Sequence, residues 1–139
     1  GKIKNGQQVI QKVDFNKCAV ANPKLAPYGL AAYETLEHMK AMAKVQPKFV
    51  EGDNIGKTYQ YVKTGNAEVG FVALSQVFKA GKLTSGSGWI VPADYYGKIA
   101  QDAVLLRNGK SPAAANQFLQ FLKGPEAAKV KVAYGYGDQ

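Results

Sequence analysis

The chain has 139 residues, which suffice for one compact domain with a hydrophobic core and are too few for two. Its 18 basic and 10 acidic residues give a formal charge of +8 that favours anionic partners, but the lysines are scattered and Arg107 is the sole arginine, which argues against a nucleic-acid site. Cys18 and His38 are single residues of their types, which excludes an internal disulfide and a cysteine- or histidine-rich zinc site, and no stretch reaches the roughly 20 apolar residues of a membrane-spanning helix.

Strand and helix patterns alternate in the first half of the chain. Apolar runs at residues 17–21 and 48–50 predict two short buried strands. Composition and helical spacing of apolar side chains predict one helix over residues 30–44 and a second over residues 53–65. Residues 67–74 have the near-continuous apolar character of a parallel strand that is covered on both faces. The first half therefore predicts repeated strand-to-helix units.

The pattern continues less regularly in the second half of the chain. Ser75 is expected to cap a short helix over residues 75–81. A turn rich in glycine and serine separates this helix from two further predicted strands, at residues 89–91 and 103–106. Two helices then complete the pattern: the first spans residues 111–123, and the second starts at the Gly-Pro pair that stops the first.

This alternation of strands and helices predicts an α/β fold with a mainly parallel sheet flanked by helices. Right-handed crossovers leave few ways to connect such a sheet. Ligands of open parallel sheets bind beyond the carboxyl ends of the strands. In this chain those ends are the loops at residues 22–29, 51–55 and 73–76, where we expect the functional site.

The first two of these loops each lead into the amino end of a helix. There the first backbone N–H groups have no partner within the helix, and the aligned peptide dipoles add about half a positive charge. Two such ends at one place form an anion site without a cationic side chain. Pro27 has no N–H but fixes the loop, so the amides of Tyr28, Gly29 and Leu30 are expected to be free and to point at one spot. Spacing alone leaves open that both are ordinary helix starts.

Three segments at these loops carry a more specific pattern. They read NPKLAPYGLAA at residues 22–32, EGDNI at residues 51–55 and GNAEVGFVALSQ at residues 65–76. In order and spacing they resemble the molybdate-binding family. The resemblance covers nearly the whole chain from Lys17 onward, because it continues through residues 99–104, 124–128 and 134–136.

Members of that family are periplasmic receptors of ABC importers, with two α/β lobes joined by a hinge. The resemblance implies that this chain is a periplasmic-binding-protein-like (type II) lobe of such a receptor. Residues 1–16 are then a hinge or a remnant of the preceding lobe, residues 17–107 the α/β anion-binding lobe, and residues 108–139 a C-terminal helical segment returning toward the missing first lobe. The chain is thus expected to be a fragment that carries about half of the binding cleft.

The resemblance also implies which residues bind the anion. Family members hold molybdate or tungstate in the cleft through neutral donors, and by that match the backbone amides of Tyr28 and Ile55 are the main donors of this lobe. Some members add a tyrosine hydroxyl at the position of Ala73, which has no hydroxyl, so that contact is absent or supplied elsewhere, for example by Tyr28. The expected ligand-binding set is Tyr28, Ile55, Pro27, Gly29 and Asn54.

Neutral donors suit this ligand because a fully deprotonated dianion needs only donors, whereas hydrogen phosphate presents a proton that requires an acceptor. Asp53 is the one carboxylate near the expected site, and we expect it to lie at the helix start and to point away from the anion. No catalytic residue, cofactor or metal is expected, other than the molybdenum within the oxyanion. The sequence therefore predicts a binding protein and not an enzyme.

The partners that the resemblance implies are a small inorganic oxyanion, the membrane permease of an ABC transporter and the missing first lobe, with no nucleic acid. The expected location is the periplasm, or a lipid-anchored position on the outer side of the cytoplasmic membrane. One alternative is the effector-sensing domain of a transcription regulator with the same bilobal fold. Another is an α/β enzyme for a phosphorylated substrate, which needs a catalytic acid or base that the sequence does not offer convincingly.

Overall fold

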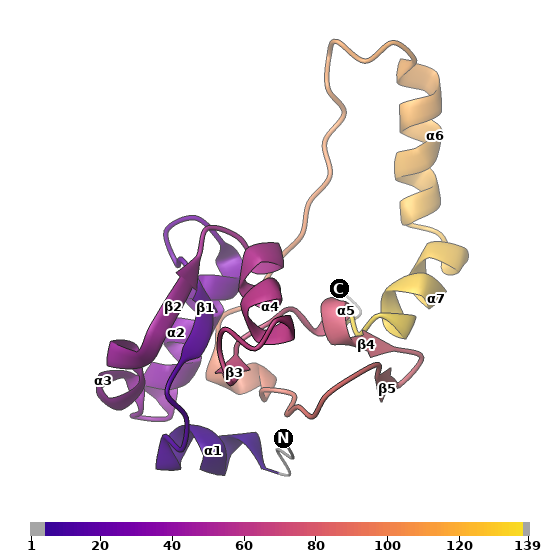
Figure 1. Cartoon of the computed structure of the whole chain (residues 1–139). Coiled ribbons are helices and arrows are strands. Elements are labelled where there is room, and N and C mark those ends of the chain that lie inside the picture. The colour runs from indigo at the N-terminus through magenta and orange to yellow at the C-terminus, as the bar shows by residue number, and fades with distance from the viewer. Residues whose placement is uncertain (1–4, 138–139) are drawn as a thin grey trace.

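The structure is a computed structural model that describes residues 5–137 of the chain. A three-stranded sheet, in the order β2-β1-β3, lies in the part of the structure that also contains α2 and α4 (Figure 1). The central strand β1 (Cys18–Ala21) pairs in parallel with β2 (Phe49–Gly52) on one side and with β3 (Val69–Gly70) on the other. The expected parallel sheet is confirmed, although β3 is much shorter than the strand expected over residues 67–74.

Helices cover the sheet on both sides. The chain passes from β1 through α2 (Pro27–His38) to β2, and then through α4 (Ile55–Lys63) back across β1 to β3. Because the two crossovers run in opposite directions, right-handed connections place α2 and α4 on opposite faces, as Figure 1 shows with α2 behind the strands. All four residues of β1 are at most 1% exposed, which explains its uninterrupted apolar sequence.

The hydrophobic core lies at the amino ends of the strands. The short helix α1 (Gly6–Lys12) begins at Asn5, whose side chain accepts a hydrogen bond from the Gln8 N–H at 3.2 Å. It buries one side chain in the core, although it falls within the segment expected to be a hinge or remnant. The core residues are Ile10, Phe15, Cys18, Leu36, Ala41 and Val45.

The single long helix expected after β1 is in fact interrupted, so that expectation is wrong. The N–H of Ala41 donates to the Leu36 carbonyl at 2.8 Å, and Lys40 between them has a left-handed φ of 53°. This is the hydrogen-bond pattern that commonly ends helices, here without the usual glycine. The chain then continues through α3 (Met42–Val45) and a 3-10 turn, η1 (Gln46–Lys48), into β2.

The segment after β3 also differs from the prediction. Ala73 rather than Ser75 precedes the first residue of α5 (Leu74–Val77), and the Gln76 side chain accepts the Ala73 N–H at 3.0 Å. Ser75 therefore lies inside the helix and does not cap it. An unpredicted hairpin of β4 (Phe78–Lys79) and β5 (Lys82–Leu83) follows. Its turn residues Ala80 and Gly81 have φ of 50° and 82°, and two left-handed residues are typical of a tight hairpin turn.

The strands expected at residues 89–91 and 103–106 are absent from the described part of the chain. Neither segment forms a helix or pairs with a strand, and only a short 3-10 turn, η2 (Ala93–Tyr95), lies between them. A strand needs a neighbouring strand to satisfy its backbone N–H and C=O groups, so an apolar sequence alone does not predict a strand. The exposed side chains of Ile90, Val104 and Leu106 reflect the missing partners.

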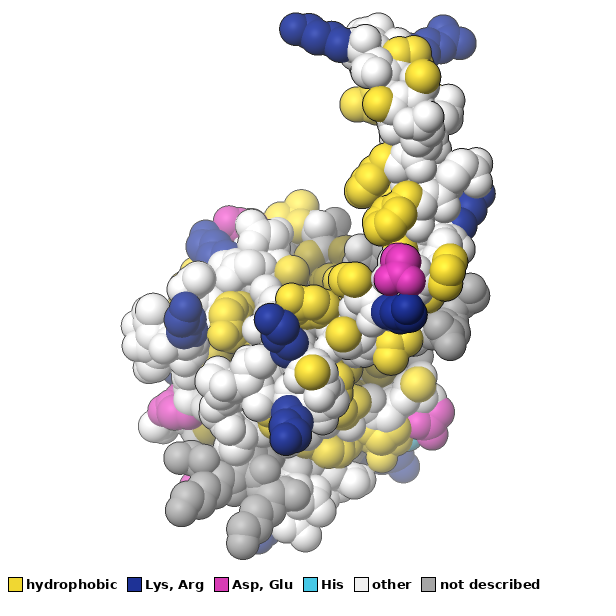
Figure 2. Space-filling model, turned by 90° about the vertical axis from the view of Figure 1, so that its right-hand side faces the viewer, with side chains coloured by type: hydrophobic (Ala, Val, Ile, Leu, Met, Phe, Trp, Pro, Cys, Tyr) yellow, Lys and Arg dark blue, Asp and Glu magenta, His cyan; other side chains and the backbone are white. Residues whose placement is uncertain are grey.

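The two last helices are confirmed and form an arm that extends away from the sheet (Figure 1). They are α6 (Pro112–Leu122) and α7 (Pro125–Ala133), which contact each other. Hydrophobic side chains lie along the surface of this arm (Figure 2), among them Phe118 and Phe121 of α6, which stack at 6.3 Å. Within residues 5–137, none of the helices has the length and apolar character that crossing a bilayer requires.

Candidate anion-binding site

The carboxyl ends of β1 and β2 lie side by side. Ala21 is paired with Gly52, and one residue later the Asn22 N–H donates to the Gly52 carbonyl at 2.8 Å. The loops that follow the two strands therefore start next to each other, at the usual interstrand spacing of about 4.8 Å. Each loop leads within a few residues to a helix, α2 after β1 and α4 after β2.

The first loop leaves one amide at the start of α2 without a protein partner. Ala26 is the residue before the helix, and its carbonyl accepts the N–H groups of Gly29 at 2.9 Å and Leu30 at 3.3 Å. Pro27 has no N–H. Within residues 5–137, nothing in the protein accepts a hydrogen bond from the Tyr28 N–H. The Tyr28 amide can therefore donate to a ligand.

The second loop leaves two amides free at the start of α4. The Asn54 side chain caps the helix by accepting the Lys57 N–H at 2.9 Å, and the Asn54 carbonyl accepts the Thr58 N–H at 3.1 Å. Among the described residues, no acceptor takes the N–H of Ile55 or of Gly56. With Tyr28, three backbone donors thus remain at two neighbouring helix starts.

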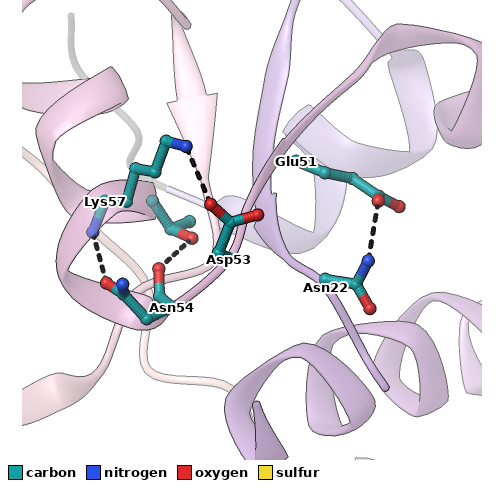
Figure 3. Close-up of polar contacts among 6 residues, drawn as sticks. Asn22, Glu51, Asp53, Asn54 and Lys57 are labelled. Atoms are coloured by element: carbon teal, nitrogen blue, oxygen red, sulfur yellow. Dashed lines mark hydrogen bonds and ion pairs between the residues drawn. The ribbon is translucent and has the colours of Figure 1, made fainter. Parts of the chain in front are cut away.

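The charges beside α4 are already paired. The Asp53 carboxylate lies 2.9 Å from the Lys57 ammonium, one helical turn along the chain, and Figure 3 shows its side chain directed toward that lysine. A hydrogen bond and the charge of Asp53 raise the pKa of Lys57. Both side chains are exposed, so we expect little stabilisation from this pair. Because Asp53 and Lys57 are paired with each other, the backbone amides are the donors available at the start of α4.

The Tyr28 side chain lies in a second polar cluster. Gln101 donates from Nε2 to the Tyr28 hydroxyl at 3.0 Å, and the Tyr136 hydroxyl, which interacts with that of Tyr28, donates to Ser75 Oγ at 3.2 Å. Burial, followed by the charge and hydrogen bond of Tyr136, raises the pKa of Tyr28. The Tyr28 side chain is therefore neutral at physiological pH and remains a hydrogen-bond donor.

The third loop is tied to the second by Gln76. Its Nε2 donates to the Ile55 carbonyl at 3.2 Å, while its Oε1 accepts the Ala73 N–H. All three predicted loops are therefore gathered at one edge of the sheet. The donors available there are uncharged, and the described residues contain no cluster of His, Cys, Asp or Glu that could hold a metal ion. Such an arrangement suits an anion that carries no proton.

Residues 1–137 match the protein family described as bacterial extracellular solute-binding protein. The chain belongs to this family. The expectation of a binding protein and not an enzyme is confirmed by this membership, because the family is one of solute-binding proteins.

Relatives of the solute-binding chain are named for molybdate. The chain is 50% identical over 139 residues to the molybdate-binding protein ModA of Azotobacter vinelandii. The alignment covers 100% of this chain and 55% of that protein. It is 48% identical over 127 residues to ModA of Rhodobacter capsulatus, in an alignment that covers 91% of this chain and 49% of that protein. The chain therefore spans about half the length of the curated relatives it matches.

A solved relative has the same fold. The periplasmic molybdate-binding protein of Azotobacter vinelandii matches with a TM-score of 0.91 at 36% sequence identity, over 100% of this chain and 61% of that one. The match includes the arm of α6 and α7, since the whole chain is covered. The predicted assignment to a lobe of the periplasmic-binding-protein type is thereby confirmed.

Two of the three amides expected to be free at the start of α2 are not free. The amides of Gly29 and Leu30 are not free, because both donate to the Ala26 carbonyl. Gly29 is instead required by packing: a Cβ there would lie 2.2 Å from the Ala21 carbonyl oxygen. Glycine at this position allows the start of α2 to approach the end of β1 closely.

Sequence reasoning also missed residues at the site. The free amide of Gly56 could have been found, because a side-chain cap at Asn54 satisfies the third amide of the helix and leaves the first two. Tyr136 and Gln101 could not have been found, since they reach Tyr28 from segments more than 70 residues away in the sequence. The structure brings Tyr28 and Ile55 to the same sheet edge, where their roles stay a prediction.

Proposed function

We propose that this chain forms one half of a cleft that binds a fully deprotonated tetrahedral oxyanion, molybdate or tungstate. One observation carries the proposal: the N–H groups of Tyr28 and Ile55 have no acceptor in the described chain and lie at helix starts that follow neighbouring strands. The identity of 50%, over all 139 residues of this chain, to a protein named molybdate-binding supports the choice of ligand.

The binding mechanism uses main-chain donors. Two helix amino ends present partial positive charge to the anion, and the free amides of Tyr28, Ile55 and Gly56 donate to its oxygens. Pro27 fixes the loop before the first donor, and Asn54 holds the first turn that carries the other two. Because every proposed contact is a donor, a protonated anion such as hydrogen phosphate would leave its own O–H unsatisfied.

The remainder of the cleft is proposed to lie outside this chain. The curated relatives are about twice as long, so a further lobe can supply the donors for the opposite side of the anion. In this proposal residues 1–16 are a hinge or remnant, residues 17–107 the anion-binding lobe and residues 108–139 a segment that returns toward the other lobe. The whole protein is proposed to serve a membrane permease of an ABC importer from the periplasm.

A titration of the isotope-labelled chain with sodium molybdate, followed by amide NMR, tests the proposal. We expect the largest shifts at the amides of Tyr28, Ile55 and Gly56, with weak affinity because half of the cleft is absent. Sulfate and phosphate at matched ionic strength are the controls, and each should shift these amides less. Equal or larger shifts with either control, or shifts confined to other residues, would contradict the proposal.

A further inference from the structure

An exposed carboxylate near the carboxyl end of β2 has an unexpected set of partners. Glu51 lies in β2, one residue before the end of the strand. Its Oε1 accepts the Tyr33 hydroxyl of α2 at 2.9 Å, and its Oε2 accepts the Asn22 Nδ2 at 3.3 Å. Figure 3 shows Asn22 and Glu51 directed toward each other across the strand ends. A single side chain thus connects a strand, a helix and the loop after β1.

Asn22 in turn determines the shape of the loop that precedes α2. Its side-chain Oδ1 accepts the Lys24 N–H at 2.9 Å. Its backbone carbonyl accepts the N–H groups of Leu25 at 3.1 Å and Ala26 at 3.0 Å. One residue therefore holds the backbone of the three residues that lead to the helix start, and the Tyr28 amide follows two residues later.

The carboxylate of Glu51 fixes which way the Asn22 amide faces. A carboxylate can only accept hydrogen bonds, so the Asn22 NH₂ group must point toward Glu51. The carbonyl oxygen of the same amide is then left on the opposite side, where it accepts the Lys24 N–H. Tyr33 holds the other oxygen of Glu51 and so limits rotation of the carboxylate. Tyr33 of α2 thus acts through Glu51 on the orientation of the Asn22 side chain in the loop.

We infer that Tyr33, Glu51 and Asn22 form a positioning chain that holds the loop at residues 22–26 in the shape that aims the Tyr28 amide at the anion. This inference rests on the proposed function. Ordering the loop before binding favours affinity, because a pre-organised donor loses less conformational freedom when the ligand arrives.

Reversing the polarity of one contact tests the inference. Asn22→Asp keeps the acceptor for the Lys24 N–H but removes the donor to Glu51 and opposes two carboxylates. We expect the molybdate concentration for half-maximal shift of the Tyr28 amide to rise about tenfold. In the double variant Asn22→Asp with Glu51→Gln, the new amide at position 51 donates to the new carboxylate at position 22 and still accepts the Tyr33 hydroxyl. Affinity should recover to within about threefold of the wild type.

A readout without ligand separates this inference from the proposed function. Hydrogen exchange of the Leu25 and Ala26 amides in the free chain should become faster in Asn22→Asp and recover in the double variant. Asn66→Asp, an exposed change of the same charge in a different loop, is the control and should alter neither exchange nor affinity. Urea unfolding of each variant checks that the fold is intact.

The outcomes are distinct. Weakened binding and faster exchange in Asn22→Asp, with recovery of both in the double variant, support the positioning chain. Unchanged exchange and affinity in Asn22→Asp, or no recovery in the double variant, would overturn it. If molybdate shifts no amide of the wild-type chain, the proposed function fails, while the exchange rates still show whether the three side chains order the loop.

Discussion

At the scale of single residues, Gly29 shows how close packing at one position supports the neighbouring Tyr28 amide. It lies where α2 comes closest to β1, and a Cβ would stand 2.2 Å from the Ala21 oxygen and 2.9 Å from the Asn22 carbonyl carbon. Gly29→Ala must therefore move backbone atoms, because no flexible side chain can yield. We expect a loss of about 1–3 kcal/mol in the free energy of unfolding, measured with urea, and weaker binding of molybdate.

The matched control for this prediction is Gly109→Ala. Its added Cβ would lie 3.5 Å from the nearest atom, the Leu106 carbonyl oxygen, which is ordinary van der Waals contact. The free energy of unfolding should change by less than about 0.5 kcal/mol. Similar losses in both variants would show that the close approach of α2 to β1 does not determine the effect.

Tyr33 gives a pH-dependent prediction at the same scale. Burial, and then the hydrogen bond to Glu51 and its charge, raise the pKa of Tyr33 to about 12. Since a tyrosine in the unfolded chain has a pKa of about 10, its neutral form is favoured by folding. This contribution to stability is fully present below about pH 10 and is lost as the pH rises through about 12.

The measurement compares the wild type with Tyr33→Phe, which lacks the titrating hydroxyl. We expect the variant to be less stable by about 0.5–1.5 kcal/mol at pH 7, from the lost hydrogen bond. The difference between the two proteins should shrink in urea unfolding at about pH 11, inside the window between the two pKa values. A difference that is the same at both pH values would contradict a raised pKa of Tyr33.

At the scale of elements, helices were easier to predict from the sequence than strands. The start of α4 could be placed because its signal is local: Asn54 caps an amide three residues further on. The predicted strands at residues 89–91 and 103–106 depended on partners that the described chain does not provide. The end of α2 was missed because its left-handed residue is Lys40, not the glycine that usually signals it.

The local features of the candidate site were predictable from the sequence, and its long-range contacts were not. Helix starts after strand ends could be found from residue patterns, and the resemblance to a family added the choice of Tyr28 and Ile55. Whether an amide is free depends on the exact course of the loop, so the amides of Gly29 and Leu30 were wrongly expected to be free. Contacts between distant segments, such as Gln101 with Tyr28, follow only from the assembled fold.

Two substitutions of Asn54, at the start of α4, separate an effect on stability from an effect on binding. Asn54→Ala removes the cap and should lower the free energy of unfolding by about 1 kcal/mol. Asn54→Asp retains a cap of similar quality, so its stability should stay within about 0.5 kcal/mol of the wild type. The new negative charge lies beside the proposed dianion and should weaken molybdate binding at least about fivefold. Unaltered affinity of the Asp variant would place the anion away from α4.

At the scale of the whole molecule, stability is unequally distributed between the sheet and the arm. Every residue of the core cluster lies before β2, and α6 contains no buried residue. Along the chain, α6 is joined to the sheet by the segment at residues 100–111, which forms no helix or strand, whereas α7 is held to the hairpin by the Ala80 N–H, which donates to the Ala133 carbonyl at 2.8 Å. Opening of α6 should therefore require much less free energy than unfolding of β1.

Native-state hydrogen exchange of Leu36→Ala tests this division. Leu36 is completely buried in the core, so its truncation should lower the free energy of unfolding by about 2–5 kcal/mol. The amides of β1 exchange through global unfolding, and their protection should fall by the same amount. The amides of α6 open by a separate local route, so their already low protection should not change. A parallel fall in α6 would instead mean that the arm and the sheet unfold as one cooperative unit, with contacts between them that determine the stability of both.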